Sequence, residues 1–126
     1  MGDTVIVLGA SPKEERFSNR AVAALKSHGH TAVPVHPKAE IIHDIPVVND
    51  IAGLSAVEAD AVSVYLSPAR FTVEYVQSLL DTLPTKPKRF IFNPHTENEA
   101  VYAVLRENSI EIVEACTLIM LDVGTW

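Results

Sequence analysis

Near its start the chain contains the stretch Thr4-Val5-Ile6-Val7-Leu8-Gly9. A short run this rich in β-branched apolar residues is typical of a strand in a parallel sheet, because helices cover both faces of such a sheet and bury successive side chains alike. Gly9 ends the run where the backbone must turn, and glycine adopts turn conformations that other residues avoid. The stretch therefore predicts the first buried strand of a parallel α/β sheet.

Four further apolar runs favour strands, and helical patterns separate them. The additional predicted strands span residues 32–35, 61–66, 89–92 and 110–113. The irregular segment 37–53 favours a short strand near 46–48 and a short helix near 51–54, whereas the apolar stretch 116–121 has no predicted element. Strands that alternate with helices form right-handed crossovers. We therefore expect residues 1–126 to form a single α/β domain, a doubly wound, mainly parallel five-stranded Rossmann-like sheet with helices on both faces.

The predicted helices begin at residues that can cap them. Ser18 is expected to cap the first helix, because a serine hydroxyl can accept a hydrogen bond from a free backbone N–H of the first turn. Ser67 followed by Pro68 fits the start of the second helix, since proline suits the first helical position. Thr96 with Glu99 three residues later matches a capping box and predicts the start of the third helix.

Composition and charge exclude several classes of protein. The 126 residues are 48% hydrophobic and carry a net charge of −6, and an acidic chain is not a general nucleic-acid binder. No apolar run approaches the roughly 18–20 residues that span a bilayer. The first residues lack the basic segment and long apolar stretch of a signal peptide. We expect a cytoplasmic protein that binds neither nucleic acid nor membrane.

The charge is unevenly distributed along the chain. Residues 1–38 hold five basic and three acidic residues, a net of +2, and the remaining 88 hold five basic and thirteen acidic residues, a net of −8. A locally basic first third in an acidic protein favours one anionic ligand held at one place. Surface charge also fluctuates by a few units in any short segment, so this observation alone does not decide between a binding site and ordinary variation.

Ligands of doubly wound sheets bind outside the carboxyl ends of the strands. The loop after the first predicted strand begins Gly9-Ala10-Ser11 and leads into a helix whose free N–H groups attract phosphate. Arg16 adds positive charge and Ser18 a hydroxyl group. The loop lacks the second and third glycines of the dinucleotide-binding pattern G-x-G-x-x-G, so glycine spacing alone identifies no ligand.

The end of the second predicted strand separates the ligand classes more sharply. An NAD-binding domain usually carries Asp or Glu there to hold the ribose 2′-hydroxyl, whereas this chain has His36-Pro37-Lys38. A lysine and a histidine suit an additional phosphate on the ribose. The residues leave two ligands open, NADP with its 2′-phosphate and coenzyme A with its 3′-phosphate.

Several motifs resemble one protein family. They are Gly9-Ala10-Ser11-Pro12, Arg16-Phe17-Ser18-Asn19, Val33-Pro34-Val35-His36-Pro37-Lys38, Phe92-Asn93-Pro94-His95-Thr96-Glu97-Asn98-Glu99 and Glu114-Ala115-Cys116-Thr117-Leu118. In order and spacing they are similar to the stand-alone CoA-binding domain proteins, which are related in fold to the N-terminal domain of the succinyl-CoA synthetase α subunit. The resemblance covers nearly the whole chain. It implies a Rossmann-like domain that binds coenzyme A, with adenine and phosphates near the first two strand ends. His95 departs from the family, which commonly has glycine there.

The strand ends and the resemblance together give a set of predicted ligand-binding residues. They are Gly9, Ala10, Ser11, Arg16, Ser18, Asn19, His36, Pro37, Lys38, Ser67, Arg70, Asn93, Pro94 and His95. The expected ligand is coenzyme A or an acyl-CoA. The alternative is an NADP-type oxidoreductase or regulatory redox domain.

The sequence shows no pattern of a nucleophile with its base and orienting group, so we expect no catalytic residue. His28 and His30 flank a helix end, where a solvated role is commoner than metal ligation, and we expect no metal site. Cys116 lies in an apolar stretch and is expected to be mainly structural, since a buried thiol has a raised pKa and reacts slowly. A larger CoA enzyme or a second copy of the chain is the expected macromolecular partner.

Overall fold

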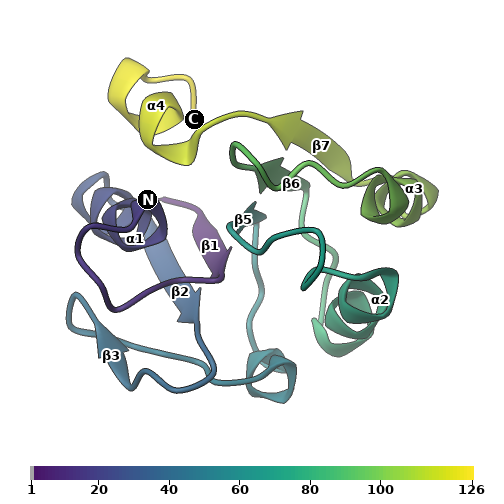
Figure 1. Cartoon of the computed structure of the whole chain (residues 1–126), viewed down its shortest axis with the longest axis horizontal. Helices are drawn as coiled ribbons and strands as arrows, with labels where there is room; N and C mark the ends of the chain where they lie inside the picture. The colour runs from purple at the N-terminus through teal and green to yellow at the C-terminus, as the bar shows by residue number, and fades with distance from the viewer. Residues whose placement is uncertain (1) are drawn as a thin grey trace.

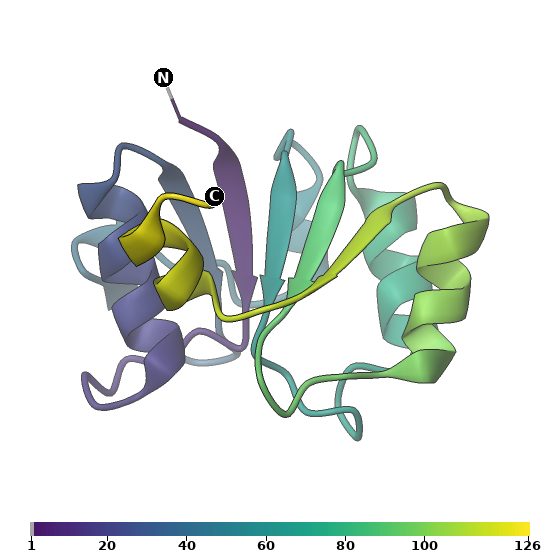
Figure 2. The same cartoon turned by 90° about the horizontal axis from the view of Figure 1, so that it is seen from above.

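The computed structural model describes residues 2–126 and contains a five-stranded parallel sheet. The strands are β1 (Thr4–Leu8), β2 (Thr31–Val35), β5 (Ala61–Val64), β6 (Arg89–Phe92) and β7 (Glu111–Glu114). Their order is β2-β1-β5-β6-β7, and each neighbouring pair is parallel. Because all five strands run in one direction, the loops that follow them meet at one edge of the sheet (Figure 2). The predicted Rossmann-like α/β fold is confirmed.

Helices cover both faces of the sheet (Figures 1 and 2). The helices α1 (Phe17–Ser27) and α4 (Thr117–Val123) lie on one face, and α2 (Val73–Thr82) and α3 (Glu99–Glu107) lie on the other. A short 3-10 helix, η1 (Ile51–Leu54), packs beside α2. This arrangement explains why the β1 run is continuously apolar: Ile6 and Leu8 join the core on the α2 side, and Val5 and Val7 join the core on the α1 side.

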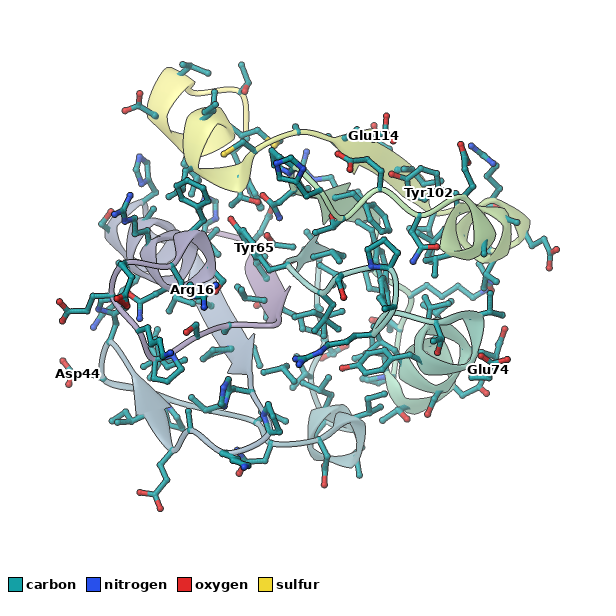
Figure 3. All side chains as sticks on the ribbon, viewed as in Figure 1. Arg16, Asp44, Tyr65, Glu74, Tyr102 and Glu114 are labelled. Carbon is teal, nitrogen blue, oxygen red and sulfur yellow. The ribbon has the colours of Figure 1, made fainter. Side chains whose placement is uncertain are left out.

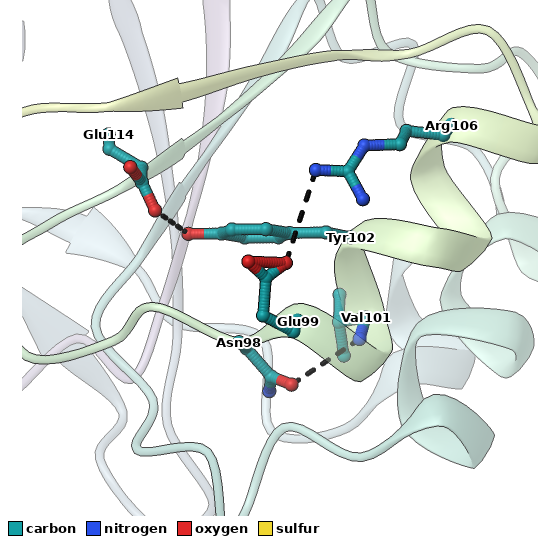
Figure 4. Close-up of polar contacts among 6 residues, drawn as sticks. All are labelled: Asn98, Glu99, Val101, Tyr102, Arg106 and Glu114. Atoms are coloured by element: carbon teal, nitrogen blue, oxygen red, sulfur yellow. Dashed lines mark hydrogen bonds and ion pairs between the residues drawn. The ribbon is translucent and has the colours of Figure 1, made fainter.

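The core on the α2 side is the more aromatic of the two. Phe71, Phe90 and Phe92 are fully buried there, and their ring centroids lie 6.1–6.4 Å apart. Tyr102 of α3 meets the Phe92 ring edge-on, with centroids 4.7 Å apart. Its hydroxyl donates to Glu114 at 2.7 Å and so joins α3 to β7 (Figure 4). Aromatic packing therefore holds the second half of the sheet together.

A hairpin extends the structure beyond β2. It consists of β3 (Ile41–Ile42) and β4 (Ile45–Pro46), and β4 lies against β2. Val48 then makes a single parallel bridge to Val35, with its N–H donating to Pro34 at 2.9 Å. The predicted strand near 46–48 is thus divided between β4 and this bridge. If the bridge is counted as a strand, the order becomes 3-2-1-4-5-6, which is the order of dinucleotide-binding sheets.

The predicted caps of the first two helices are wrong. The first helix begins two residues earlier than expected, because Arg16 occupies the N-cap position and Ser18 is buried inside the first turn. The carbonyl of Ser67 accepts hydrogen bonds in a separate turn that carries Phe71 into the core. The second helix begins only after Thr72, whose hydroxyl accepts from the Tyr75 N–H at 3.1 Å.

The predicted capping box is also wrong. Asn98 caps α3 with its side-chain oxygen on the Val101 N–H at 3.3 Å (Figure 4), whereas the Thr96 hydroxyl donates to the Asn93 carbonyl at 2.7 Å. The stretch that had no predicted element forms α4, which buries Thr117, Met120 and Leu121. At seven residues, α4 is too short to show a clear helical repeat in the sequence.

Candidate functional site

A cavity of about 1110 Å³ opens at the carboxyl edge of the sheet, between the loops that follow β1, β2 and β5. It is lined by Gly9, Ala10, Ser11, Lys13, Arg16, Phe17, Ser18, Val35, His36, Pro37, Asn49, Asp50, Ile51, Ala52, Tyr65, Leu66, Arg70 and Tyr75. In Figure 3, which looks onto this edge, Arg16 and Tyr65 lie near the centre of the molecule and Asp44 and Glu74 lie at its outside. The cavity is where the fold predicts a ligand to bind.

The structure brings part of the predicted residue set to this cavity. Predicted residues that line it are Gly9, Ala10, Ser11, Arg16, Ser18, His36, Pro37 and Arg70. Predicted residues outside the lining are Asn19, Lys38, Ser67, Asn93, Pro94 and His95. The lining also includes residues that the sequence did not single out, chiefly the segment 49–52 and the aromatic residues Phe17, Tyr65 and Tyr75.

Gly9 is a crowded position in the cavity wall. Its φ is +82°, and a Cβ atom placed on it would lie 3.1 Å from the backbone carbon of Tyr65 and from the Leu66 side chain. Both the conformation and the close approach therefore favour glycine. The neighbouring N–H of Ala10 donates to the Val35 carbonyl at 3.1 Å, so the loop after β1 is fastened to the end of β2.

Positive charge dominates the lining. Lys13, Arg16 and Arg70 face a single acidic lining residue, Asp50, which gives the lining a formal net charge of +2. Within residues 2–126 the one ion pair joins Arg106 to Glu99 at 4.0 Å on α3 (Figure 4), so the three cations of the cavity have no carboxylate partner there. The first turn of α1 adds the positive end of a helix dipole. The cavity is therefore suited to an anion.

His36 is held in one tautomer by the loop after β2. Its Nδ1 accepts the N–H groups of Lys38 at 3.1 Å and Ala39 at 2.9 Å, so the proton of the neutral ring belongs on Nε2. Asn49 fixes the same loop by donating to the carbonyls of His36 at 2.8 Å and Ala39 at 2.9 Å. His36 therefore offers the cavity a hydrogen-bond donor on a fixed loop.

Asn93 lies behind the cavity in a buried polar cluster. Its amide group donates to Ser63 Oγ at 3.0 Å and to the Val64 carbonyl at 2.9 Å, and its oxygen accepts from the Thr117 N–H at 2.8 Å. These bonds join β5, β6 and α4, which is a structural role. The exposed His95 has a φ of +74°, a left-handed conformation that glycine adopts more readily than histidine.

Tyr65 separates the cavity from this polar cluster. The predicted strand 61–66 ends at Val64, so Tyr65 belongs to the loop, and it also lines the cavity. Its hydroxyl is buried and makes no hydrogen bond of acceptable geometry within the described part of the chain, although Thr117 and Ser63 lie nearby. Burial, followed by the neighbouring Cys116, raises the pKa of this phenol, while the two hydroxyl groups partly offset that rise. Tyr65 is therefore a neutral donor throughout the physiological pH range.

A second cavity, of about 440 Å³, lies between α3 and β7. Its polar side chains already contact one another: Tyr102 donates to Glu114, and the Arg106 guanidinium lies 5.8 Å from the centre of the Tyr102 ring (Figure 4). Burial and then the Glu114 carboxylate raise the pKa of Tyr102. The polar side chains that line this second cavity are thus already paired with one another. The cations of the larger cavity, in contrast, have no carboxylate partner within the described residues.

Between residues 2 and 126, no group of three or more His, Cys, Asp or Glu side chains is arranged to hold a metal ion. Over the same range, no helix has both the length and the apolar character needed to cross a membrane.

Comparison with protein families identifies the chain. A model of the CoA binding domain matches residues 3–122, which is nearly all of the sequence. The chain belongs to the CoA-binding domain family. The resemblance seen in the sequence motifs is thereby confirmed, and the family supports a small-molecule ligand related to coenzyme A. A search of curated proteins found no match.

Solved structures share the fold of this chain. One described as an uncharacterized protein is 37% identical, with a TM-score of 0.85, and the match covers 100% of this chain and 99% of that one. A hypothetical protein from Pyrococcus horikoshii is 25% identical, with a TM-score of 0.82 and coverage of 97% and 83%. An imine reductase from Myxococcus stipitatus in complex with NAD+ is 13% identical, with a TM-score of 0.62 and coverage of 89% and 39%, and so shares the fold alone.

Proposed function

We propose that the larger cavity binds coenzyme A or an acyl-CoA. The observation that carries this proposal is the convergence of Lys13, Arg16 and Arg70, without carboxylate partners, on one cavity of an acidic member of the CoA-binding domain family. Coenzyme A is strongly anionic, and charge-assisted hydrogen bonds from arginine and lysine are the usual way to hold phosphates. The cavity volume of about 1110 Å³ is ample for a ligand of this length.

The ligand's diphosphate is proposed to lie over the first turn of α1, between Lys13 and Arg16. Free N–H groups and the helix dipole favour a phosphate there. Arg70 lies on the opposite loop, after β5, and is proposed to contact a second phosphate. The remaining arm would then pass along Tyr65 and Tyr75, whose rings supply apolar wall on that side of the cavity.

We propose that this chain binds its ligand in the cytoplasm and does not itself catalyse a reaction. The proposed macromolecular partner is a larger CoA enzyme or a second copy of the chain. Cys116 is a half-buried residue at the N-cap position of α4 and, in the present proposal, is mainly structural. The alternative ligand is NADP, which also carries a ribose phosphate.

Isothermal titration calorimetry with CoA, acetyl-CoA, dephospho-CoA, NADP and NAD tests the proposal. CoA or acetyl-CoA is expected to bind with the highest affinity, and dephospho-CoA more weakly because it lacks the 3′-phosphate. Tighter binding of NADP than of either CoA compound would favour the oxidoreductase alternative. Heat from none of the five ligands would refute a nucleotide site of this type.

A further inference from the structure

Asn19 connects the loop after β1, which lines the cavity, to the β3–β4 hairpin, which lies far from that loop in the sequence. It is buried, at 4% exposure, and does not line the cavity. Its Nδ2 donates to the Ser11 carbonyl at 2.8 Å, and its Oδ1 lies 2.7 Å from Nε2 of His43. Because Nδ2 already faces a carbonyl, Oδ1 is the acceptor and His43 the donor. The result is a continuous polar connection from His43 through Asn19 to Ser11.

The hairpin that carries His43 is poorly stabilised by its own residues. Its strands β3 and β4 have two residues each, and a hairpin this short is not stable by itself. The turn places His43 at φ +49° and Asp44 at φ +65°. Neither residue is a glycine, so both adopt a left-handed conformation at an energetic cost. Contacts outside the turn therefore hold it: Lys26 Nζ donates to the His43 carbonyl at 3.1 Å, and Ile42 is buried beside α1.

The Ser11 carbonyl is the group through which this connection reaches the ligand site. Ser11 lines the same cavity as Lys13 and Arg16, and a carbonyl oxygen directed at a bound phosphate would repel it. Asn19 holds that oxygen on the side of α1. Within residues 2–126, Asn19 also provides the only side-chain hydrogen bond to the backbone of loop 9–16 from outside that loop.

We propose that Asn19 and His43 are positioning residues for the ligand-binding loop, so that the β3–β4 hairpin and the cavity are energetically coupled. This inference rests on the proposed CoA site. Coupling of this kind is reciprocal. A change in the hairpin alters the affinity for CoA, and bound CoA in turn stabilises the hairpin.

Calorimetry on His43→Ala, Asn19→Ala and the double variant tests the coupling. Each single change is expected to weaken CoA binding about tenfold, which corresponds to the roughly 1–1.5 kcal/mol of a lost hydrogen bond. The double variant should lose no more than either single one, because both remove the same connection. His43→Gln, whose amide can still donate to Asn19, should stay within about threefold of the unaltered protein.

Asn98→Ala is the matched control. Asn98 is also a buried asparagine that fastens a segment, donating to the Phe71 carbonyl at 2.7 Å, but neither Asn98 nor Phe71 lines the cavity. It should lower the melting temperature without changing the CoA affinity more than about twofold. Additive losses in the double variant, unchanged affinity in both single variants, or an equal loss in Asn98→Ala would each overturn the proposal.

Hydrogen exchange in the unliganded protein separates this inference from the proposed function. Residues 10–16 should exchange faster in His43→Ala and Asn19→Ala than in Asn98→Ala. If the unaltered protein binds no CoA but loop exchange responds as expected, the proposed ligand is wrong and the positioning role stands. Loop exchange that responds to neither variant overturns the positioning role whatever ligand the cavity binds.

Discussion

Glycines with the same backbone conformation have different roles in this protein. Gly9 and Gly29 have φ values of +82° and +83°, but only Gly9 is crowded, since nothing lies within 4 Å of a Cβ atom placed on Gly29. The pair therefore separates the cost of a left-handed conformation from the cost of a steric clash.

Gly9→Ala is expected to lower the free energy of unfolding more than Gly29→Ala does. Each substitution incurs the conformational cost of roughly 1–2 kcal/mol, and only Gly9→Ala also presses against the backbone of Tyr65. Thermal unfolding of both variants measures the difference. Gly9→Ala should also weaken CoA binding, because Gly9 lines the cavity. Equal losses of stability in the two variants would contradict the crowding at Gly9.

Tyr65→Phe removes a buried hydroxyl that has no hydrogen-bond partner in the described structure. Removing such a group relieves its desolvation cost, so the variant should be as stable as the unaltered protein or more stable by up to about 1 kcal/mol. Tyr102→Phe, which loses the bond to Glu114, is the contrasting case and should be less stable. Urea denaturation compares them. A marked loss of stability in Tyr65→Phe would show that its hydroxyl has a partner.

Alkaline pH should destabilise the fold through Tyr65 and Tyr102. Burial raises the pKa of both phenols above the ordinary 10.0. Below pH 10.0 both are protonated in the folded and unfolded chains, and their contribution to stability is intact. Above it the unfolded chain releases these protons first, so the free energy of unfolding falls as pH rises. Melting curves of the Tyr65→Phe/Tyr102→Phe double variant should decline less steeply, and an identical decline would contradict this assignment.

Two arginines in loops line the cavity, whereas Arg106 on α3 does not. Arg16→Ala and Arg70→Ala, in the loops after β1 and β5, should each weaken CoA binding by roughly 1–3 kcal/mol, the range for losing a charge-assisted hydrogen bond. Arg106→Ala on α3, where the only ion pair within residues 2–126 lies, is the matched control and should leave the affinity unchanged. A similar loss in all three variants would indicate general electrostatic attraction rather than a site.

Lys38 shows where prediction from the sequence was incomplete at the level of a loop. Its position after the second strand suited a ribose phosphate, but the turn that bonds its N–H to His36 leaves it exposed and outside the cavity lining. Its contact with the 3′-phosphate stays a prediction. Calorimetry of Lys38→Ala with CoA and dephospho-CoA decides it, since equal losses for both ligands would exclude that role.

The strands were predictable because short apolar runs rich in β-branched or aromatic residues are typical of buried strands. The ends of β1, β2, β5 and β6 lie at the predicted residues or within two residues of them. The helix starts were not. Ser67 and Thr96 each lie close to a second residue able to cap, Thr72 and Asn98, and the outcome depends on how Phe71 and Asn93 are buried, which no local pattern records. The segment 49–52 reaches the cavity only because Val48 returns to the edge of β2.

In the whole molecule, the amino edge of the sheet is closed by side-chain contacts, whereas the carboxyl edge is open. At the amino edge the residues just before β1 meet the C-terminal residue: the Trp126 ring donates to Asp3 at 3.0 Å, and the Arg89 guanidinium lies 4.6 Å from the centre of that ring. Figure 2 shows the C-terminus on this side of the sheet, the side on which β1 begins. The carboxyl edge instead remains open as the cavity. Of the basic residues concentrated in the first third of the sequence, Lys13 and Arg16 line the cavity, whereas Arg20, Lys26 and Lys38 do not.

The most direct test of the central claim is a two-dimensional ¹H–¹⁵N NMR titration of the protein with CoA, because it reports where the ligand binds as well as whether it binds. The account predicts that the largest shift changes fall in segments 9–18, 36–37, 49–52 and 65–75, with smaller changes in the hairpin around His43. The amides around Trp126 and along α3 should be unaffected. Shift changes concentrated along α3 and β7, or a spectrum that CoA leaves unchanged, would contradict a CoA site at the carboxyl edge of the sheet.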